Sequence, residues 1–244
     1  MDTLIAVSPN IGLVSRPLVI CFVLLGLALG LRRTPLAHGA RVATWLAIAV
    51  PLLVWFLLMT WIGQTDLYQT APWTRRAAVV LPPLIWLALL MRSKRMATVL
   101  DTTPLSWIIG IQVYRLLGFV FLAQWAAGRL PGIFAIPAGI GDALTGALAL
   151  PVAIYVARRA AHWRLAGYAW NALGLADFAM ALAIAIFVVG DTGLRYPLIM
   201  IPTFAVPLGI VLHVLSLWQL SRAPRSPESS SAHAAGEPAI SLSR

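Results

Sequence analysis

Three ionisable side chains lie in the middle of apolar segments, where a charge is costly. Arg115, Asp142 and Asp177 each fall about nine to twelve residues from one end of such a segment, which at 1.5 Å per residue places them at a common depth. An arginine or aspartate at the bilayer centre costs about 2.5–3.5 kcal/mol on insertion scales, so these side chains are expected to face protein or water. One guanidinium and two carboxylates sum to a charge of −1, which favours one aspartate paired with Arg115 and the other protonated. The sequence predicts a proton-binding centre, or else a buried ion pair that only sets helix packing.

Further polar residues extend this centre. Asn171, Gly174 and Asp177 follow one another at intervals of three and form a sloping stripe on one helix. His213 lies about seven residues from the end of the last apolar segment, and could relay protons or form an interhelical hydrogen bond. Gln112 is expected at the depth of Asn171. The candidate substrate- or proton-binding residues are therefore Arg115, Asp142, Asn171, Asp177, His213 and Gln112.

A metal site is the weaker interpretation of the same residues. Asp142, Asp177 and His213 have the composition of a two-carboxylate, one-histidine site, but no tight ligand spacing accompanies them. We predict no metal and no cofactor. The only lysine, Lys94, lies between apolar segments, which excludes a retinal Schiff base, and no phosphate-binding glycine motif is present.

The stretch Ile136–Asp142 contains a proline and two glycines within an apolar segment. Proline removes a backbone donor and glycine admits unusual φ angles, so the sequence predicts a broken helix here. Asp142 could cap the resumed helix. Broken helices at mid-depth form substrate sites in transporters, and a hinge without a ligand is the alternative.

Composition identifies the solvent of these helices as lipid. The chain has 244 residues, of which 60% are hydrophobic and 11% charged, whereas soluble domains average about 45–50% and 25%. Ten tryptophans gather mainly near the ends of apolar runs, as at a bilayer interface. The net charge of +10 comes from short loops between these runs, so it does not indicate nucleic acid. A single cysteine excludes a disulfide framework.

We predict an all-α polytopic transmembrane bundle of about seven helices in residues 1–220, followed by a disordered cytoplasmic tail, 221–244. Such a tail buries too little apolar surface to fold. A membrane span needs about 20 residues. The seven segments are Pro17–Leu31, Val42–Ile62, Ala77–Met91, Leu105–Ala127, Ile133–Ala157, Leu165–Val189 and Tyr196–Leu220, of which the first and third are short and must be extended at their N-terminal ends.

Arginine and lysine set the orientation. Of the 18 basic residues, 12 fall on one side (Arg32, Arg33, Arg41, Arg92, Lys94, Arg95, Arg158, Arg159, Arg164, Arg222, Arg225 and Arg244), 5 on the other (Arg16, Arg75, Arg76, Arg129 and Arg195), and Arg115 lies within a span. The richer side should be cytoplasmic, with the N-terminus outside and the C-terminus in the cytoplasm. The preference for arginine over lysine suggests a bacterial genome, and hence the bacterial inner membrane.

An internal repeat is a further hypothesis. The first and fifth spans are each followed by two arginines, a histidine, another arginine and a tryptophan, and the third and seventh each carry two prolines. These features fit a parallel 3+1+3 arrangement, which occurs in transporters. The alternative is that every cytoplasmic loop attracts arginine.

The chain resembles a group of bacterial seven-span membrane proteins without a characterised activity. The resemblance rests on Gln112-x-x-Arg115-x-x-Gly118, Pro137-x-Gly139-x-Gly141-Asp142, Trp170-Asn171-x-x-Gly174-x-x-Asp177 and Ile201-Pro202-Thr203-Phe204 with Pro207 and His213, and covers about residues 105–220. It implies a membrane fold and brings no reaction with it.

The favoured function is therefore a small-solute or proton-coupled transporter in the lipid bilayer. In it, Asp142 and Asp177 would bind protons or cations, and Arg115 would be their counter-ion or an anion anchor. An intramembrane enzyme acting on a lipid or isoprenoid with the same carboxylates is the first alternative. A non-catalytic partner subunit with a structural polar centre is the second.

The orientation can be tested with single cysteines in a Cys21→Ser background. Cysteines at Thr34, Ser93, Ala160 and Ser229 should resist an impermeant thiol reagent in intact cells and react after permeabilisation, because all four lie on the arginine-rich side. Labelling at position 229 without permeabilisation would show that the orientation is wrong.

Overall fold

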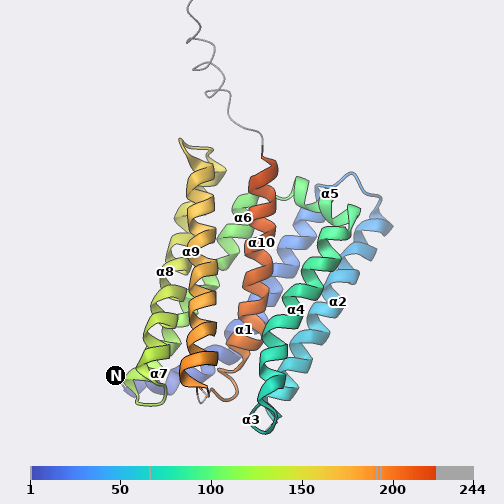
Figure 1. The fold of residues 1–244 in the computed structure, drawn as a ribbon. Coiled ribbons are helices and arrows are strands. Elements are labelled where there is room, and N and C mark those ends of the chain that lie inside the picture. The colour runs from blue at the N-terminus through green and yellow to red at the C-terminus, as the bar shows by residue number, and fades with distance from the viewer. Residues whose placement is uncertain (1, 66, 191, 193, 224–244) are drawn as a thin grey trace, which may run out of the picture.

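The chain folds into a bundle of helices (Figure 1). The computed structural model describes the backbone of residues 2–65, 67–190, 192 and 194–223, with the side chains of 2–16, 69 and 72 left out. Within these residues there is no β-strand. The helices are α1 (Asp2–Arg32), α2 (His38–Gly63), α3 (Leu67–Thr70), α4 (Pro72–Arg92), α5 (Lys94–Thr102), α6 (Leu105–Gly110), the 3₁₀ segment η1 (Ile111–Gly118), α7 (Phe119–Ala126), α8 (Gly132–Ala157), α9 (Trp163–Ala183), the π-helical turns η2 (Ile184–Val189) and η3 (Ile201–Ala205), and α10 (Val206–Arg222).

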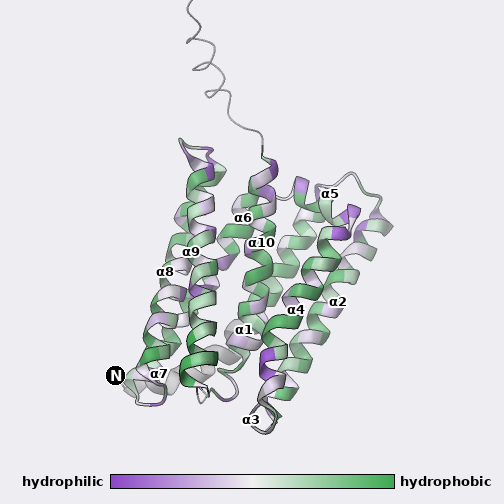
Figure 2. Cartoon of the chain, in the orientation of Figure 1, coloured by the Kyte–Doolittle hydropathy of each residue, from purple (hydrophilic) through white to green (hydrophobic). Residues whose placement is uncertain are grey.

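Six helical stretches are long and apolar enough to cross a membrane: His38–Gly63, Trp73–Arg92, Leu105–Ala126, Gly132–Ala157, Trp163–Val189 and Ile201–Arg222. Their outer faces carry large apolar side chains such as Leu57, Leu89, Leu165 and Phe187, each more than 60% exposed. Hydrophobic residues dominate the helices between their ends (Figure 2). Because water would not tolerate so much exposed apolar surface, the chain is an integral membrane protein.

The predicted all-α, multi-pass fold is confirmed at this level. The described apolar part of α1, Pro17–Arg32, is shorter than the other spans, so the seventh span stays a prediction. The orientation and the internal repeat likewise stay predictions. Most of the predicted tail, from residue 224 on, lies outside the described residues, and α10 continues to Arg222.

The loops between α1 and α2, between α4 and α5, and between α8 and α9 lie at the same end of the bundle as the C-terminus of α10 (Figure 1). This end carries the described basic residues that the sequence assigned to the cytoplasm, and we call it the arginine-rich end. Helix α5 also lies there, with Met96, Val99 and Leu100 buried and its basic residues exposed. The sequence analysis did not predict this short amphipathic helix.

The predicted break at Ile136–Asp142 is wrong. Helix α8 runs unbroken from Gly132 to Ala157, and Asp142 caps no helix. Pro137 lies inside the helix and removes only the backbone hydrogen bond to the Ile133 carbonyl oxygen, and the helix continues past it. The glycines instead allow close approach, since a Cβ at Gly139 would come within 2.8 Å of Leu122 Cγ.

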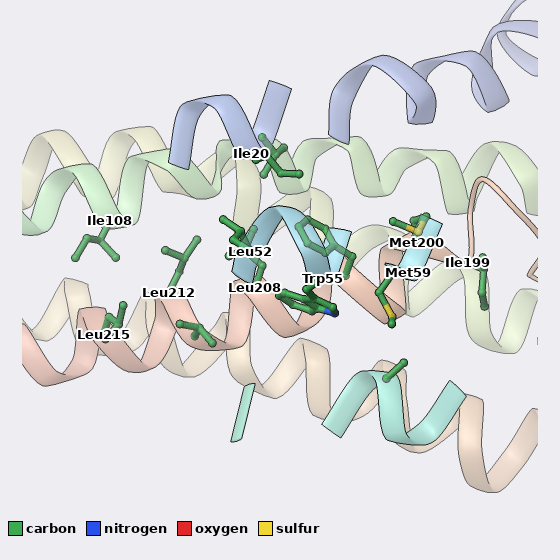
Figure 3. Close-up of a cluster of buried hydrophobic side chains, with 14 of the residues drawn as sticks. Ile20, Leu52, Trp55, Met59, Ile108, Ile199, Met200, Leu208, Leu212 and Leu215 are labelled. Carbon is green, nitrogen blue, oxygen red and sulfur yellow. The ribbon is translucent and has the colours of Figure 1, made fainter. Parts of the chain in front are cut away.

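Helix α10 is the centre of the bundle and packs on α4, α6 and α9. Within the most apolar 18 residues of the Ile201–Arg222 stretch, 61% are buried inside the bundle, against 11–39% in the other five membrane-capable stretches. Near its start, the ring of Phe204 stacks on Trp55 of α2 with centroids 4.6 Å apart. Leu208, Leu212 and other aliphatic residues continue this core along α10 (Figure 3). A polar residue on the buried side of α10 is therefore shielded from lipid.

Helix α8 and η1 approach each other closely at Gly146. A Cβ added at Gly146 would lie 2.5 Å from the backbone nitrogen of Leu116 and 2.9 Å from the carbonyl carbon of Arg115. Any side chain here would push η1, and Arg115 with it, away from α8.

Gly146→Ala should therefore destabilise the protein by about 1–3 kcal/mol through overpacking. Gly39→Ala is the matched control, because nothing lies within 4 Å of an added Cβ there. Thermal unfolding in detergent measures both. Equal stability of the two variants would contradict the described packing of α8 on η1.

Candidate functional site

The centre of the site is the guanidinium of Arg115, which is only 2% exposed. Its Nε donates to Asp142 Oδ1 at 2.8 Å, and its Nη2 donates to Asp177 Oδ2 at 2.5 Å. Its Nη1 lies 3.0 Å from His213 Nε2 and 3.4 Å from the carbonyl oxygen of Gly174. All three guanidinium nitrogens thus hold partners on α8, α9 and α10. The three charges that the sequence placed at one depth form a single contact group.

The geometry fixes the tautomer of His213. A guanidinium has only donors, so His213 Nε2 must accept from Arg115 and carry no proton. The ring proton is then on Nδ1, which donates to Asn171 Oδ1 at 2.9 Å. The Asn171 amide donates in turn to Ser216 Oγ at 2.9 Å and to the Gly167 carbonyl oxygen at 2.8 Å. A continuous polar chain therefore runs from Arg115 between α9 and α10 toward the arginine-rich end.

Aromatic rings pack against the guanidinium of Arg115 and the imidazole of His213. The Arg115 Cζ lies 3.8 Å from the ring centroid of Phe178, a cation–π contact. The ring of Trp170 packs on His213 at a centroid distance of 4.8 Å, and its Nε1 donates to the carbonyl oxygen of Thr145 at 3.0 Å. These contacts restrict the rotation of both the guanidinium and the imidazole.

Three glycines make room for the charged side chains. A Cβ at Gly118 would clash with Asp142, one at Gly141 with the carboxylate of Asp177, and one at Gly174 with the imidazole and with Arg115 Nη1. The backbone of three helices therefore approaches the ion cluster more closely than any other residue type allows.

One of the two aspartates has a carboxylate oxygen without a hydrogen-bond partner in the described part of the chain. Asp177 Oδ1 is buried and has no hydrogen-bond partner among the described residues. A buried carboxylate oxygen without a partner is costly, and the cluster has an excess negative charge when both aspartates are ionised. A proton or a cation at Asp177 Oδ1 would remove both costs.

A cavity of about 100 Å³ reaches these carboxylates. Asp142 and Asp177 line its inner limit, and Arg75, Arg76 and Thr192 line it near the end opposite the arginine-rich end. Its walls are mainly aliphatic and aromatic residues of α4, α7, α8, α9, η2, η3 and the start of α10. Helices α4 and α9, which face each other across it, both pack on α10 and do not pack extensively on each other.

Gln112 is the predicted residue that stays outside this group. It is fully buried, but neither polar atom of its amide has a hydrogen-bond partner in the described part of the chain. No group of three or more His, Cys, Asp or Glu among the described residues is arranged to hold a metal ion. Asp142, Asp177 and His213 direct their contacts to Arg115 instead.

Sequence reasoning missed the contributions of Phe178, Trp170 and the two arginines at the cavity. Nothing in an aromatic residue within an apolar helix distinguishes a ring that stacks on a charge from one that faces lipid. In the sequence, Arg75 and Arg76 lie at the start of the third span, and they entered only the count of basic residues that predicts the orientation.

Comparison with known proteins adds one finding. Residues 72–221 match the model of a family described as Domain of unknown function (DUF8737), and this stretch contains every residue of the site. No curated protein and no solved structure matches the chain.

The ion cluster makes a prediction about coupled substitutions. Arg115→Leu should lower the free energy of unfolding by about 3–5 kcal/mol, because two carboxylates lose their counter-ion in a buried place. Adding Asp142→Asn or Asp177→Asn should recover part of the loss, since one stranded charge is then removed. Thermal unfolding in detergent measures this, with Arg92→Leu, an exposed arginine at the end of α4, as the control. Strictly additive losses in both double variants would contradict the coupling.

Proposed function

We propose that this chain, which belongs to the family described as Domain of unknown function (DUF8737), is a proton-coupled carrier of a small amphipathic solute. The observation that supports this function best is the cavity that ends at Asp177, whose Oδ1 is buried and has no partner. A group that needs a proton and is reached through a cavity can exchange that proton. Because Arg115 donates to the other oxygen of the same carboxylate, protonation of Asp177 changes the net charge of the whole cluster.

The cavity lining indicates the chemistry of the solute. A cavity of about 100 Å³ is somewhat smaller than the roughly 150 Å³ apolar cavity that binds benzene, so it accommodates a ligand of a few heavy atoms. Its walls offer apolar contact along most of their length and polar groups only at the two limits. A small molecule with an apolar body and one polar end fits this distribution.

The polar chain on the other side of Arg115 offers a path for protons. His213, Asn171 and Ser216 connect the cluster toward the arginine-rich end, with a neutral imidazole in the middle. Beyond them, Leu220 is fully buried and Arg164 donates to its carbonyl oxygen at 2.9 Å, which joins α9 to α10. The cavity that reaches the carboxylates lies toward the opposite end, and access from one end is expected of one state of an alternating-access carrier.

The irregular helical turns lie where such a carrier would need to move. The π-helical turns η2 and η3 both contribute residues to the cavity wall, including Ile186 and Pro202. π-Helical turns are rare and are frequently found at functional sites.

A second candidate is an intramembrane enzyme acting on a lipid or isoprenoid. The apolar cavity walls and the separation of α4 from α9 favour it, because a lipid chain could reach Asp142 and Asp177 between these helices. A partner subunit whose polar centre only sets helix packing does not require a cavity that reaches Asp142 and Asp177.

The carrier requires a proton on the cluster. Purified protein should show the infrared carbonyl band of a protonated carboxylic acid, and Asp177→Asn should remove it. Proteoliposomes with an internal pH dye and an imposed membrane potential should admit protons several-fold faster with the wild type than with Asp177→Asn. Asp101→Asn is the matched control, because Asp101 is an exposed carboxylate away from the cavity.

Three outcomes separate the candidates. Equal proton flux in wild type, Asp177→Asn and protein-free vesicles, with no protonated carboxyl band, would contradict the carrier. A chemical change in bilayer lipids incubated with wild type but not with Asp177→Asn would favour the enzyme. A site that only sets packing predicts altered stability in Asp177→Asn with neither effect.

A further inference from the structure

A second cavity lies away from the ion cluster, at the arginine-rich end. It has a volume of about 390 Å³, compared with about 100 Å³ for the cavity at Asp177. Three parts of the chain surround it: the connection from α5 to α6, the turn from α8 to α9, and the end of α10 (Figure 1). It shares no residue with the Arg115 cluster, so it is independent of the proposed carrier function.

We propose that this cavity binds the headgroup of an anionic phospholipid with free hydroxyl groups, such as phosphatidylglycerol. Two arginines line it, Arg159 and Arg222. Guanidinium groups form strong, charge-assisted hydrogen bonds with phosphate oxygens. The one acidic residue in the lining, Asp101, leaves a net charge of +1 and matches a phosphodiester with a neutral headgroup.

The second observation is a fixed acceptor within the same lining. The amide nitrogen of Gln219 donates to the carbonyl oxygens of Leu100 and Thr103, the latter at 2.9 Å. These bonds hold Oε1 in place, yet Oε1 is buried without a hydrogen-bond partner in the described residues. Its partner must be a donor, which a bare phosphate lacks and a hydroxyl group supplies.

The turn that ends α8 places Arg159 at the cavity. Arg159 has φ of 47°, the left-handed residue of a Schellman motif in which its N–H donates to the Val156 carbonyl oxygen and the Ala160 N–H to that of Tyr155. Its guanidinium carbon lies 5.5 Å from the ring centroid of Trp163. The conformation also contributes Arg159 to the same cavity as Arg222.

The position favours a lipid over a soluble phosphate. The cavity lies where four membrane-capable stretches end, at the level expected for headgroups, and Leu105, Val156 and Trp163 give it an apolar side. An acyl chain can continue along such a surface, whereas a free phosphate ester gains nothing from it.

Native mass spectrometry of the delipidated full chain in detergent tests the site. Titration with phosphatidylglycerol should show one tight-binding lipid. The Kd should weaken by about tenfold or more in Arg159→Gln/Arg222→Gln, and stay within about twofold of wild type in Arg92→Gln, a basic residue at the same end but outside the cavity. Equal weakening in both variants, or none in either, would overturn the proposal. Thermal unfolding of each lipid-free variant checks that it is folded.

Two comparisons test the headgroup chemistry with the wild-type protein alone. Phosphatidylmethanol carries the same charge without hydroxyl groups, and should bind several-fold more weakly because Gln219 Oε1 then stays without a donor. Equal binding would refute the role of Gln219. Glycerophosphoglycerol supplies the same phosphodiester headgroup without acyl chains, and should not displace the lipid at millimolar concentration. Full displacement would identify a soluble phosphate ester as the ligand instead.

Discussion

The bridge from one guanidinium to two carboxylates is the interaction on which the arrangement of the helices depends. Arg115 on η1 bonds to Asp142 on α8 and Asp177 on α9, and its remaining nitrogen reaches His213 on α10. In lipid none of these groups could face outward at low cost. The requirement that they meet therefore fixes the depth and the rotation of four segments together. The glycines around the cluster and the close crossing of α8 over η1 follow from it.

Depth was predictable from the sequence because helices rise regularly and spans have a nearly constant length. Counting residues from the span ends was enough to bring Arg115, Asp142 and Asp177 to one level. Which helices pack against one another was not predictable in this way. Nothing in the spacing says that α8 and α9 both pack where η1 presents its arginine, or that His213 rather than Gln112 reaches the guanidinium. These facts depend on helix rotation, which side-chain packing over the whole bundle decides.

Proline and glycine misled the prediction at Ile136–Asp142. Both residue types break helices in water, but in a membrane a straight helix keeps its backbone groups satisfied while glycine serves packing. Helix α8 accordingly stays intact, and the irregular backbone appears at η1, η2 and η3 instead. Of these, only η3 begins with a sequence signal, Ile201-Pro202. The tight turns of η1 carry no glycine or proline before Gly118, so tertiary contacts with α8 explain them better than local propensity.

Two of the buried acceptors that have no partner among the described residues, Asp177 Oδ1 and Gln219 Oε1, differ in a way that favours different partners. Asp177 Oδ1 is charged when ionised, lies among helices and meets a cavity with room for only a few atoms. The smallest donor, a proton, satisfies it and cancels the excess charge. Gln219 Oε1 is neutral, lies at the membrane surface and meets a cavity about four times as large, with two arginines in its lining. There a proton would gain nothing, because an amide oxygen is not basic, and only a molecule with its own donor completes the bonding. The same accounting of buried polar atoms thus underlies both proposals, an ion at the centre and a lipid at the end.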